Sequence, residues 1–408
     1  MNGTDKFHLC LRSLGYVTKI RGVLGGVVLA VVVFAAALGT ALAAATKSEL
    51  DGEGVVKIGA ILPLSGDFAC NGECVKKGLE MAVKKLREGN HRFKIEYADN
   101  KSAPTDGKEF YERLEGRGVK YFVVLHPRMA LNIANYANGK DQIVFGLGVM
   151  DDNEAKNYNR FVKVTASTKD LIGEIAKYSR GNLKAENAAI VHVATPYGEN
   201  SSNVFRGEFG WLGGKIVSEQ KFDRGEGNFK SILKEIEDAS PDVIFFAGAG
   251  DSHRGLIDGI TLRLPNVPIV GDSSFNLPRA RRSINPDANI YYSESAVSPE
   301  FLEQFRKEYK EEGSALSALA YAIPFLLCDA IQNSPDKNAP ALLDHIRKTK
   351  QSPAFEVFEF LPSGELKTKI QVRKFSEKQG KAENQHTILN PSFHLYTENL
   401  HPVLANKK

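Results

Sequence analysis

Along most of the chain, two patterns of apolar and polar residues follow each other in turn, one typical of strands and one typical of helices. Short runs of β-branched and apolar residues, typical of buried parallel strands, precede stretches whose apolar residues recur every three or four positions, as on one helix face. The first run, at 55–62, is ended by Pro63, and helical spacing begins at Cys74. The loop between them, 64–73, would lie at the carboxyl end of the strand, where open α/β sheets bind ligands.

The alternation predicts an α/β fold with two Rossmann-like lobes, each a parallel sheet flanked by helices. The first crossing between the lobes is expected near 165–169. Near the C-terminus, 356–360 and 369–375 are separated by the turn residues Pro362-Ser363-Gly364 and are expected to pair as a hairpin. Further strands are expected at 93–97, 119–125, 142–147, 161–164, 188–193, 215–222, 242–247, 268–272 and 289–295.

The two ends of the chain have different patterns. Basic residues precede an uncharged apolar run from Gly22 to Ala45, with small residues at the spacing that a signal peptidase recognises. We interpret residues 1–45 as a signal peptide or as a retained membrane anchor through 22–45, because the run approaches the roughly 20 residues of a membrane span. From 377 to 408 the periodicity disappears, so this segment is interpreted as a C-terminal tail.

Composition and charge exclude several classes of protein. The 408 residues, 42% of them hydrophobic, are enough for two domains with ordinary cores. The formal net charge of +4 is concentrated in the first 45 residues and the remainder is nearly neutral, which argues against a nucleic-acid partner. No G-x-S-x-G, H-E-x-x-H or Walker motif is present, so we expect neither an enzyme nor a cofactor or metal site.

Cys70 and Cys74 lie four positions apart at the expected junction of loop and helix. In an exported protein they could form a small disulfide that stiffens the loop. They could equally be two free, partly buried thiols. Cys328 lies on an apolar helical face and is expected in the core.

Two sequence motifs in the first strand, loop and helix resemble those of branched-chain-amino-acid-type substrate-binding proteins of ABC importers. They are I-G-x-x-x-P-L-S-G from Ile58 and K-K-G-L-E-M-A-V from Lys76. This is the Leu/Ile/Val-binding protein family, which has the type I periplasmic-binding fold. Further similar pieces are A-T-P-Y-G at 194–198, N-F-x-x-x-L-x-x-I at 228–236, G-D at 271–272, A-Y-A at 320–322 and F-x-P-x-G-E-L at 360–366.

The resemblance implies two lobes joined by three hinge crossings, with a ligand in the cleft between them. After a linker at 46–54, we expect lobe 1 to contain 55–167 and 296–352, and lobe 2 to contain 168–295 and 353–376. The implied function is a periplasmic solute-binding protein in amino-acid transport. It would be a monomer that captures a small polar ligand, such as an amino acid or a related carboxylate or amide, by hinge closure.

The implied partners are an ABC permease and its ATPase, neither of which is visible in this sequence. The alternative is a receptor or scaffold of the same fold that senses a ligand or binds a protein partner without transport.

The family's loop after the third strand is a hydroxyl-rich turn that opens a helix and binds the ligand's carboxylate. Here that loop reads His126-Pro127-Arg128. Pro127 suits the first turn of a helix, and the free N–H groups of that turn, together with Arg128, could bind a carboxylate. His126 could instead be a satisfied, half-buried histidine, and Arg128 a solvated helix residue.

Two other loops of lobe 1 contribute candidates. Ser65 and Asn71 in the first loop could make hydrogen bonds to a ligand, although such residues also form turns. Gly148, Val149 and Met150 follow the fourth strand, where the family tends to have a small, hydroxyl-bearing group.

The candidates in lobe 2 are an aromatic residue and an acid. Tyr197 matches the family's aromatic residue that closes over the ligand, and Asp272 lies at or next to the acid that pairs with the ligand's ammonium group. Tyr197 could instead pack on its own lobe, and Asp272 could cap the following helix.

Overall fold

A computed structural model describes residues 54–103, 105–149, 157–223, 225–248, 252–285, 288–362 and 364–375. The expected signal peptide or anchor at 1–45, the linker apart from its last residue, and the expected tail at 377–408 lie outside the described residues. Met150 lies outside them as well.

The first sheet has the strand order β2-β1-β3-β4-β5. Its pairs β1–β3, β3–β4 and β4–β5 are parallel. The strands are β1 (Val56–Leu62), β2 (Phe93–Asp99), β3 (Tyr121–Leu125), β4 (Ile143–Leu147) and β5 (Phe161–Lys163). Every residue of β4 is buried, which explains why this strand is a continuous apolar run in the sequence.

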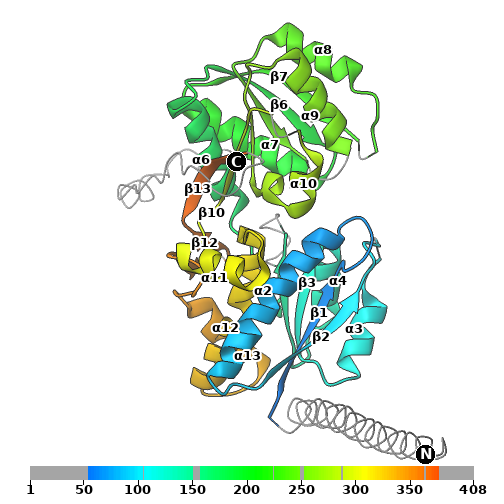
Figure 1. Cartoon of the computed structure of the whole chain (residues 1–408), viewed down its shortest axis with the longest axis vertical. Helices are drawn as coiled ribbons and strands as arrows, with labels where there is room; N and C mark the ends of the chain where they lie inside the picture. Colours follow the sequence, from blue (N-terminus) through cyan, green and yellow to red (C-terminus); the bar gives the residue numbers. More distant parts are fainter. Residues whose placement is uncertain are drawn as a thin grey trace, which may run out of the picture. The chain divides into compact units, whose positions relative to one another are not determined.

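Helices from both ends of the chain accompany this sheet, and together they form lobe 1. They are α2 (Ala69–Glu88), α3 (Lys108–Glu115), α4 (Pro127–Tyr136), α11 (Pro299–Tyr309), α12 (Ala315–Asn333) and α13 (Ala339–Lys348). Figure 1 shows α2 alongside α12. Gly78 permits this approach, because a Cβ atom there would lie 2.2 Å from the Ser317 carbonyl oxygen. Among the described helices only α12 is long and apolar enough to cross a membrane, and 72% of its apolar window is buried.

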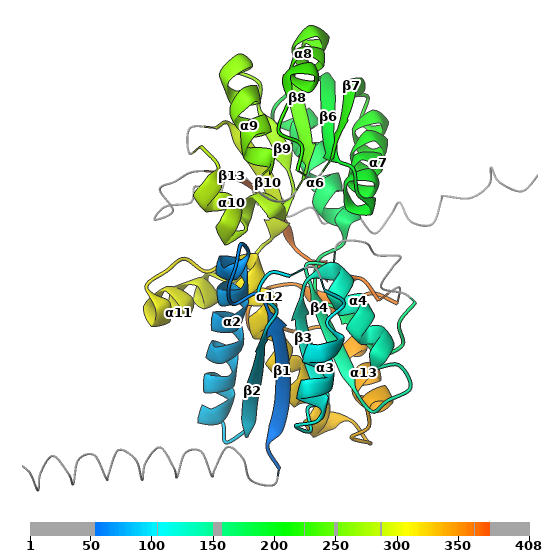
Figure 2. The same cartoon turned by 90° about the vertical axis from the view of Figure 1, so that its right-hand side faces the viewer.

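The second sheet has the order β13-β10-β9-β8-β6-β7, and only the β13–β10 pair is antiparallel. Its strands are β6 (Asn187–Val193), β7 (Lys215–Phe222), β8 (Val243–Ala247), β9 (Ile269–Gly271), β10 (Ile290–Ser295) and β13 (Ile370–Lys374). The helices of this lobe 2 are α6 (Thr168–Gly181), α7 (Pro196–Trp211), α8 (Lys230–Ala239), α9 (Ser252–Arg263), α10 (Pro278–Ser283) and the 3₁₀ helix η1 (Ser273–Asn276). Figure 2 shows α7 and α9 on opposite faces of the sheet, which bury two separate hydrophobic clusters.

Three segments of the chain connect the two sheets and lie side by side. The first follows β5, the second follows β10, and the third joins β12 (Leu366–Thr368) to β13. Ala166 bridges Leu366, the Ala296 amide donates to the Lys369 carbonyl at 2.7 Å, and the hydroxyl groups of Ser295 and Thr368 are 2.7 Å apart. The predicted α/β fold with two parallel-dominated, helix-flanked sheets is confirmed.

The predicted hairpin partner was wrong. β11 (Phe358–Phe360) pairs with β12, whereas 370–374 joins β10 in the second sheet. Gly364, at φ +84°, occupies the turn as expected, but a turn signal identifies a bend without specifying which later segment pairs across it. The hairpin contacts α13 of lobe 1. The partition of 353–376 into lobe 2 stays a prediction.

The first helix begins earlier than its periodicity predicted. α2 starts at Ala69, so Asn71 and Gly72 lie in its first turn instead of in a loop. A Cβ atom at Gly72 would lie 2.0 Å from the Pro63 carbonyl oxygen. This glycine therefore serves the close packing of the helix start on the end of β1, and it is not a loop residue.

Candidate functional site

Two lobe 2 candidates form a hydrogen-bonded pair. Tyr197 lies in the first turn of α7, which follows β6, and Asp272 follows β9. Both strands are neighbours of β8 in a parallel arrangement, so their carboxyl ends share one edge of the sheet. The Tyr197 phenol donates to Asp272 Oδ2 at 2.7 Å. The fold therefore brings the two candidates together at the edge where such sheets bind ligands.

Asp272 also caps the following 3₁₀ helix, as the alternative interpretation predicted. Its Oδ1 atom accepts from the Ser274 amide at 2.9 Å, and the residue is 2% exposed. Burial, and then the negative charge of Asp272, raise the pKa of Tyr197 well above its usual value. The phenol thus stays protonated and remains a donor. A carboxylate has more acceptor positions than these two bonds occupy. A ligand contact from Asp272 stays a prediction.

The first loop of lobe 1 is held by the carboxylate at the end of β2. Asp99 Oδ1 accepts from the amides of Leu64, Ser65 and Lys101 at 2.9, 3.1 and 2.8 Å. The Ser65 hydroxyl donates to Asp99 Oδ2 at 2.6 Å. Partial burial raises the pKa of Asp99, but these hydrogen bonds outweigh it and lower the pKa overall. Ser65 therefore has the turn-forming role, and a ligand contact from it stays a prediction.

Asn71 contacts the other lobe. It is 6% exposed, and its Oδ1 atom accepts from the Arg279 amide in α10 at 3.3 Å. The Arg279 guanidinium lies over the Phe68 ring, 4.3 Å from its centre, and 3.9 Å from the Asp67 carboxylate. Sequence reasoning missed Arg279 and Phe68. The sequence signal for Arg279 was the arginine-rich segment P-R-A-R-R at 278–282, which follows Asp272 by six residues.

The predicted helix start after the third strand is confirmed, because α4 begins at Pro127. His126 is the N-cap residue, and its Nδ1 atom accepts from the Met129 amide at 3.4 Å. The ring is half-buried, which agrees with the alternative of a satisfied histidine. Arg128 is exposed in the first turn. Its contact with a ligand stays a prediction.

In the segment after β4, the backbone is the part available for a ligand contact. Gly148 adopts φ +72°, and its amide donates to the Thr165 hydroxyl at 3.1 Å. Val149 is fully buried in the hydrophobic core of lobe 1, so its side chain contacts the core and only its backbone could reach a ligand. The third candidate of this loop, Met150, is outside the described residues.

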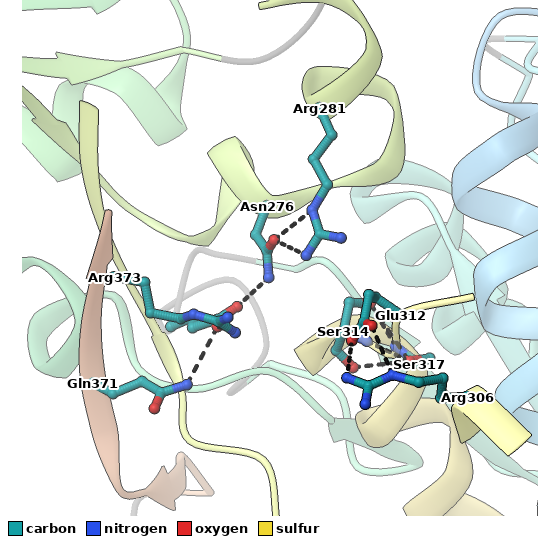
Figure 3. A network of polar contacts seen from close by, with 9 residues as sticks. Asn276, Arg281, Arg306, Glu312, Ser314, Ser317, Gln371 and Arg373 are labelled. Carbon is teal, nitrogen blue, oxygen red and sulfur yellow. Dashed lines mark hydrogen bonds and ion pairs between the residues drawn. The ribbon is translucent and has the colours of Figure 1, made fainter. Parts of the chain in front are cut away.

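A buried acid in β10 is linked by hydrogen bonds, through Asn276, to Arg281 of α10. Glu294 is 1% exposed and lies 3.0 Å from Arg373 Nη1, with Gln371 donating at 3.3 Å. The Asn276 amide group also donates to Glu294, and Arg281 Nε donates to Asn276 Oδ1 at 2.6 Å (Figure 3). The network fixes the orientation of the segment that carries Arg279.

Within the described residues Cys70, Cys74 and Cys328 are free thiols, which for Cys70 and Cys74 is one of the two alternatives. Cys74 Sγ lies 3.2 Å from the Ser314 hydroxyl, and burial raises its pKa. Cys328 is buried in the core, as predicted. Across the described part of the chain, no group of three or more His, Cys, Asp or Glu side chains could hold a metal ion.

A cavity of about 680 Å³ lies between β5, α13 and the β11–β12 hairpin. It contains none of the predicted site residues. Its charged lining is largely paired, since Lys348 lies 2.6 Å from Asp344 and Lys350 lies 3.0 Å from Glu359. The cavity is therefore not part of the candidate site.

Curated relatives match about half of the chain. Leu/Ile/Val-binding protein homolog 2 of Brucella abortus is 27% identical over 201 residues, which are 47% of this chain and 54% of the relative. Leu/Ile/Val-binding protein homolog 3 of Brucella melitensis is 23% identical over 223 residues, 53% of this chain and 58% of the relative. The chain thus spans little more than half the length of these relatives.

Solved structures match most of the chain in fold. A leucine-binding protein LivK of Thermotoga maritima has a TM-score of 0.73 at 20% identity, covering 83% of this chain and 99% of its own. LivJ of Streptococcus pneumoniae, in complex with isoleucine, has a TM-score of 0.69 at 22% identity, covering 81% and 98%. A solute-binding protein of R. palustris, in complex with 4-hydroxybenzoate, has a TM-score of 0.71 at 19% identity, covering 81% and 96%.

These structures share the fold with this chain, and a sequence model supplies the family. The model of the periplasmic binding protein family matches residues 55–365, well over half of the 408 residues. The matched region runs from the start of the first strand through the β11–β12 turn and contains both sheets up to the last crossing. The chain therefore belongs to the periplasmic binding protein family.

Proposed function

We propose that this chain is the extracytoplasmic solute-binding protein of an ABC importer and captures a small carboxylate between its two lobes. The observation that carries the proposal is the Tyr197–Asp272 pair at the carboxyl edge of the second sheet. The first sheet contributes the start of α4 at the corresponding edge, with the backbone amide and the exposed side chain of Arg128. A ligand held by both lobes favours their closed arrangement, because only that arrangement makes both sets of contacts.

The two ends of the ligand would differ in chemistry. A carboxylate suits the start of α4, since the backbone amide and the guanidinium of Arg128 can both donate to it. The opposite end would meet the Tyr197 ring and the remaining acceptor positions of Asp272, which suit an ammonium or a hydroxyl group. Amino acids and hydroxylated aromatic acids both have this pattern, and the relatives solved with isoleucine and with 4-hydroxybenzoate support both classes.

The test is a thermal-shift screen of the purified protein against amino acids, hydroxybenzoates, dicarboxylates, amides and small peptides. A ligand present at about 100 times its dissociation constant should stabilise the protein by roughly 2.7 kcal/mol. The shift should be lost in Asp272→Asn if the ligand presents an ammonium group, because a neutral amide cannot pair with that charge. It should be retained in Arg263→Ala, which removes a surface arginine of α9.

The alternative is a receptor or scaffold of the same fold. The burial of Asp272 favours it, because that acid already accepts from Tyr197 and from the Ser274 amide. A cooperative melt without a shift from any compound in the panel would support this alternative. Periplasmic location, the permease and its ATPase are parts of the importer proposal, and loss of ligand uptake in a deletion strain would test them together.

A further inference from the structure

Helix α10 begins without a cap from its own sequence. Its N-cap residue, Leu277, has no side-chain oxygen, and Pro278 occupies the first turn. The N–H groups at a helix start need partners from outside the helix. For Arg279 that partner is Asn71 Oδ1 at 3.3 Å, from the first turn of α2 in the other lobe and 208 residues away in the sequence. A side chain of lobe 1 therefore supplies a cap to a helix of lobe 2.

The Arg279 side chain reaches the same part of lobe 1. Its guanidinium lies 4.3 Å from the centre of the Phe68 ring, within the range of a cation–π interaction. The Asp67 carboxylate lies 3.9 Å away, but its side chain is 82% exposed, so this ion pair contributes little. Arg279 itself is only 14% exposed. The stacking on Phe68 and the bond to Asn71 thus join the two lobes at Arg279.

Both sides of the contact are held in place by hydrogen bonds within their own lobe. In lobe 1, the Ser102 hydroxyl accepts from the Phe68 amide at 2.9 Å and donates to the Ser65 carbonyl at 2.8 Å. In lobe 2, the Glu294 network holds Asn276 and Arg281 on either side of Arg279. A contact between two ordered surfaces loses less conformational entropy when it forms, so it stabilises the joined state more effectively.

We propose that Arg279 is a clasp between the lobes: by stacking on Phe68 and binding Asn71 it favours their closed arrangement before a ligand is present. The clasp shifts the population of open and closed forms, and a shift of this kind changes the apparent affinity for anything that binds the closed form. The consequence for affinity rests on the proposed function. The clasp itself does not.

The test uses the purified protein without any ligand and compares Arg279→Ala, Phe68→Ala and the double variant with the parent. Small-angle X-ray scattering should give a larger radius of gyration in both single variants. Amide exchange of the peptide 277–283 should become about fivefold faster, the change expected for a cation–π contact of ordinary strength. The double variant should resemble either single variant, because one contact cannot be lost twice.

Arg263→Ala is the matched control, since it removes an arginine of the same lobe that forms only a surface ion pair with Glu237 at 3.2 Å. Arg279→Lys keeps the charge and most of the stem, and should shift both readouts less than Arg279→Ala. It also serves as the test if Arg279→Ala does not fold. Unchanged scattering and exchange in the Arg279 variants, or additive effects in the double variant, would overturn the clasp. Neither readout needs a ligand, so a failed ligand screen would count against the proposed function alone.

Discussion

Tyr197 and Asp272, which are 75 residues apart in the sequence, are joined by a hydrogen bond of 2.7 Å from phenol to carboxylate. The pair forms because β6 and β9 both lie next to β8 in the second sheet. It combines an aromatic surface with an acid at the carboxyl edge of a parallel sheet, where open α/β sheets bind ligands. It also stabilises the lobe, because Asp272 is buried and needs its donors.

Tyr197→Phe should lower the free energy of unfolding by about 1–2 kcal/mol, since it leaves a buried carboxylate oxygen without its donor. Urea unfolding of the two proteins measures this difference. Tyr121→Phe is the matched control, because no hydrogen bond joins the Tyr121 hydroxyl to the described residues. Equal losses in the two variants would show that the bond to Asp272 contributes nothing measurable.

Glu294 and Arg373 form a buried ion pair, and we expect the loss of one partner to cost more stability than the loss of both. Arg373→Met should destabilise the protein by about 3 kcal/mol, because it leaves the Glu294 charge buried without its cation. Adding Glu294→Gln should restore part of that loss, since it removes the unpaired charge and its amide oxygen still accepts from one of the two donors, Asn276 or Gln371. Chemical denaturation of the single and double variants tests the coupling, and a simple sum of the two single losses would contradict it.

The first loop should lose its order in acid. The lowered pKa of Asp99 means that its stabilising contribution is complete above the pKa of the unfolded chain. The contribution is then lost as the pH falls through the lower pKa of the folded state. Asp99→Asn should therefore cost about 1 kcal/mol at pH 7, from charge-assisted hydrogen bonds, and clearly less near pH 3.

The measurement for Asp99→Asn is the urea midpoint of variant and parent at both pH values. Asp258→Asn, which removes a surface acid 3.5 Å from Arg254 in α9, is the control. A pH-independent loss in Asp99→Asn would show that its charge is not what holds the loop.

Two glycines in helices should respond in opposite directions to alanine. At Gly78 the added Cβ atom would meet the Ser317 carbonyl at 2.2 Å, so α2 and α12 would have to separate. We expect a loss of about 1–3 kcal/mol, typical of overpacking. At Gly207 in α7 no atom lies within 4 Å, so alanine should stabilise the helix by up to about 1 kcal/mol. Thermal melts of the two variants test this contrast, which the same sign of shift would contradict.

Much of the fold was predictable because its signals are local. β4 is buried along its whole length, so its sequence is an apolar run whatever its neighbours are. The start of α4 at Pro127 was predictable for a similar reason, since proline fits the first turn of a helix by its own geometry. The choice of partner for 370–374 was not predictable, because a strand's pairing depends on segments far away in the chain.

The sequence by itself determined the alternation of strands and helices and the two-lobed α/β class, because periodicity depends only on neighbouring residues. Tyr197 and Asp272 became candidates through the resemblance of short motifs to a known family. Only the tertiary structure decided that these two side chains bond to each other. It also decided that Asn71 caps a helix of the other lobe and that Arg279 stacks on Phe68. The physical reason is that each of these contacts joins residues far apart in the chain, and their distance is set by the packing of whole elements and by no local pattern.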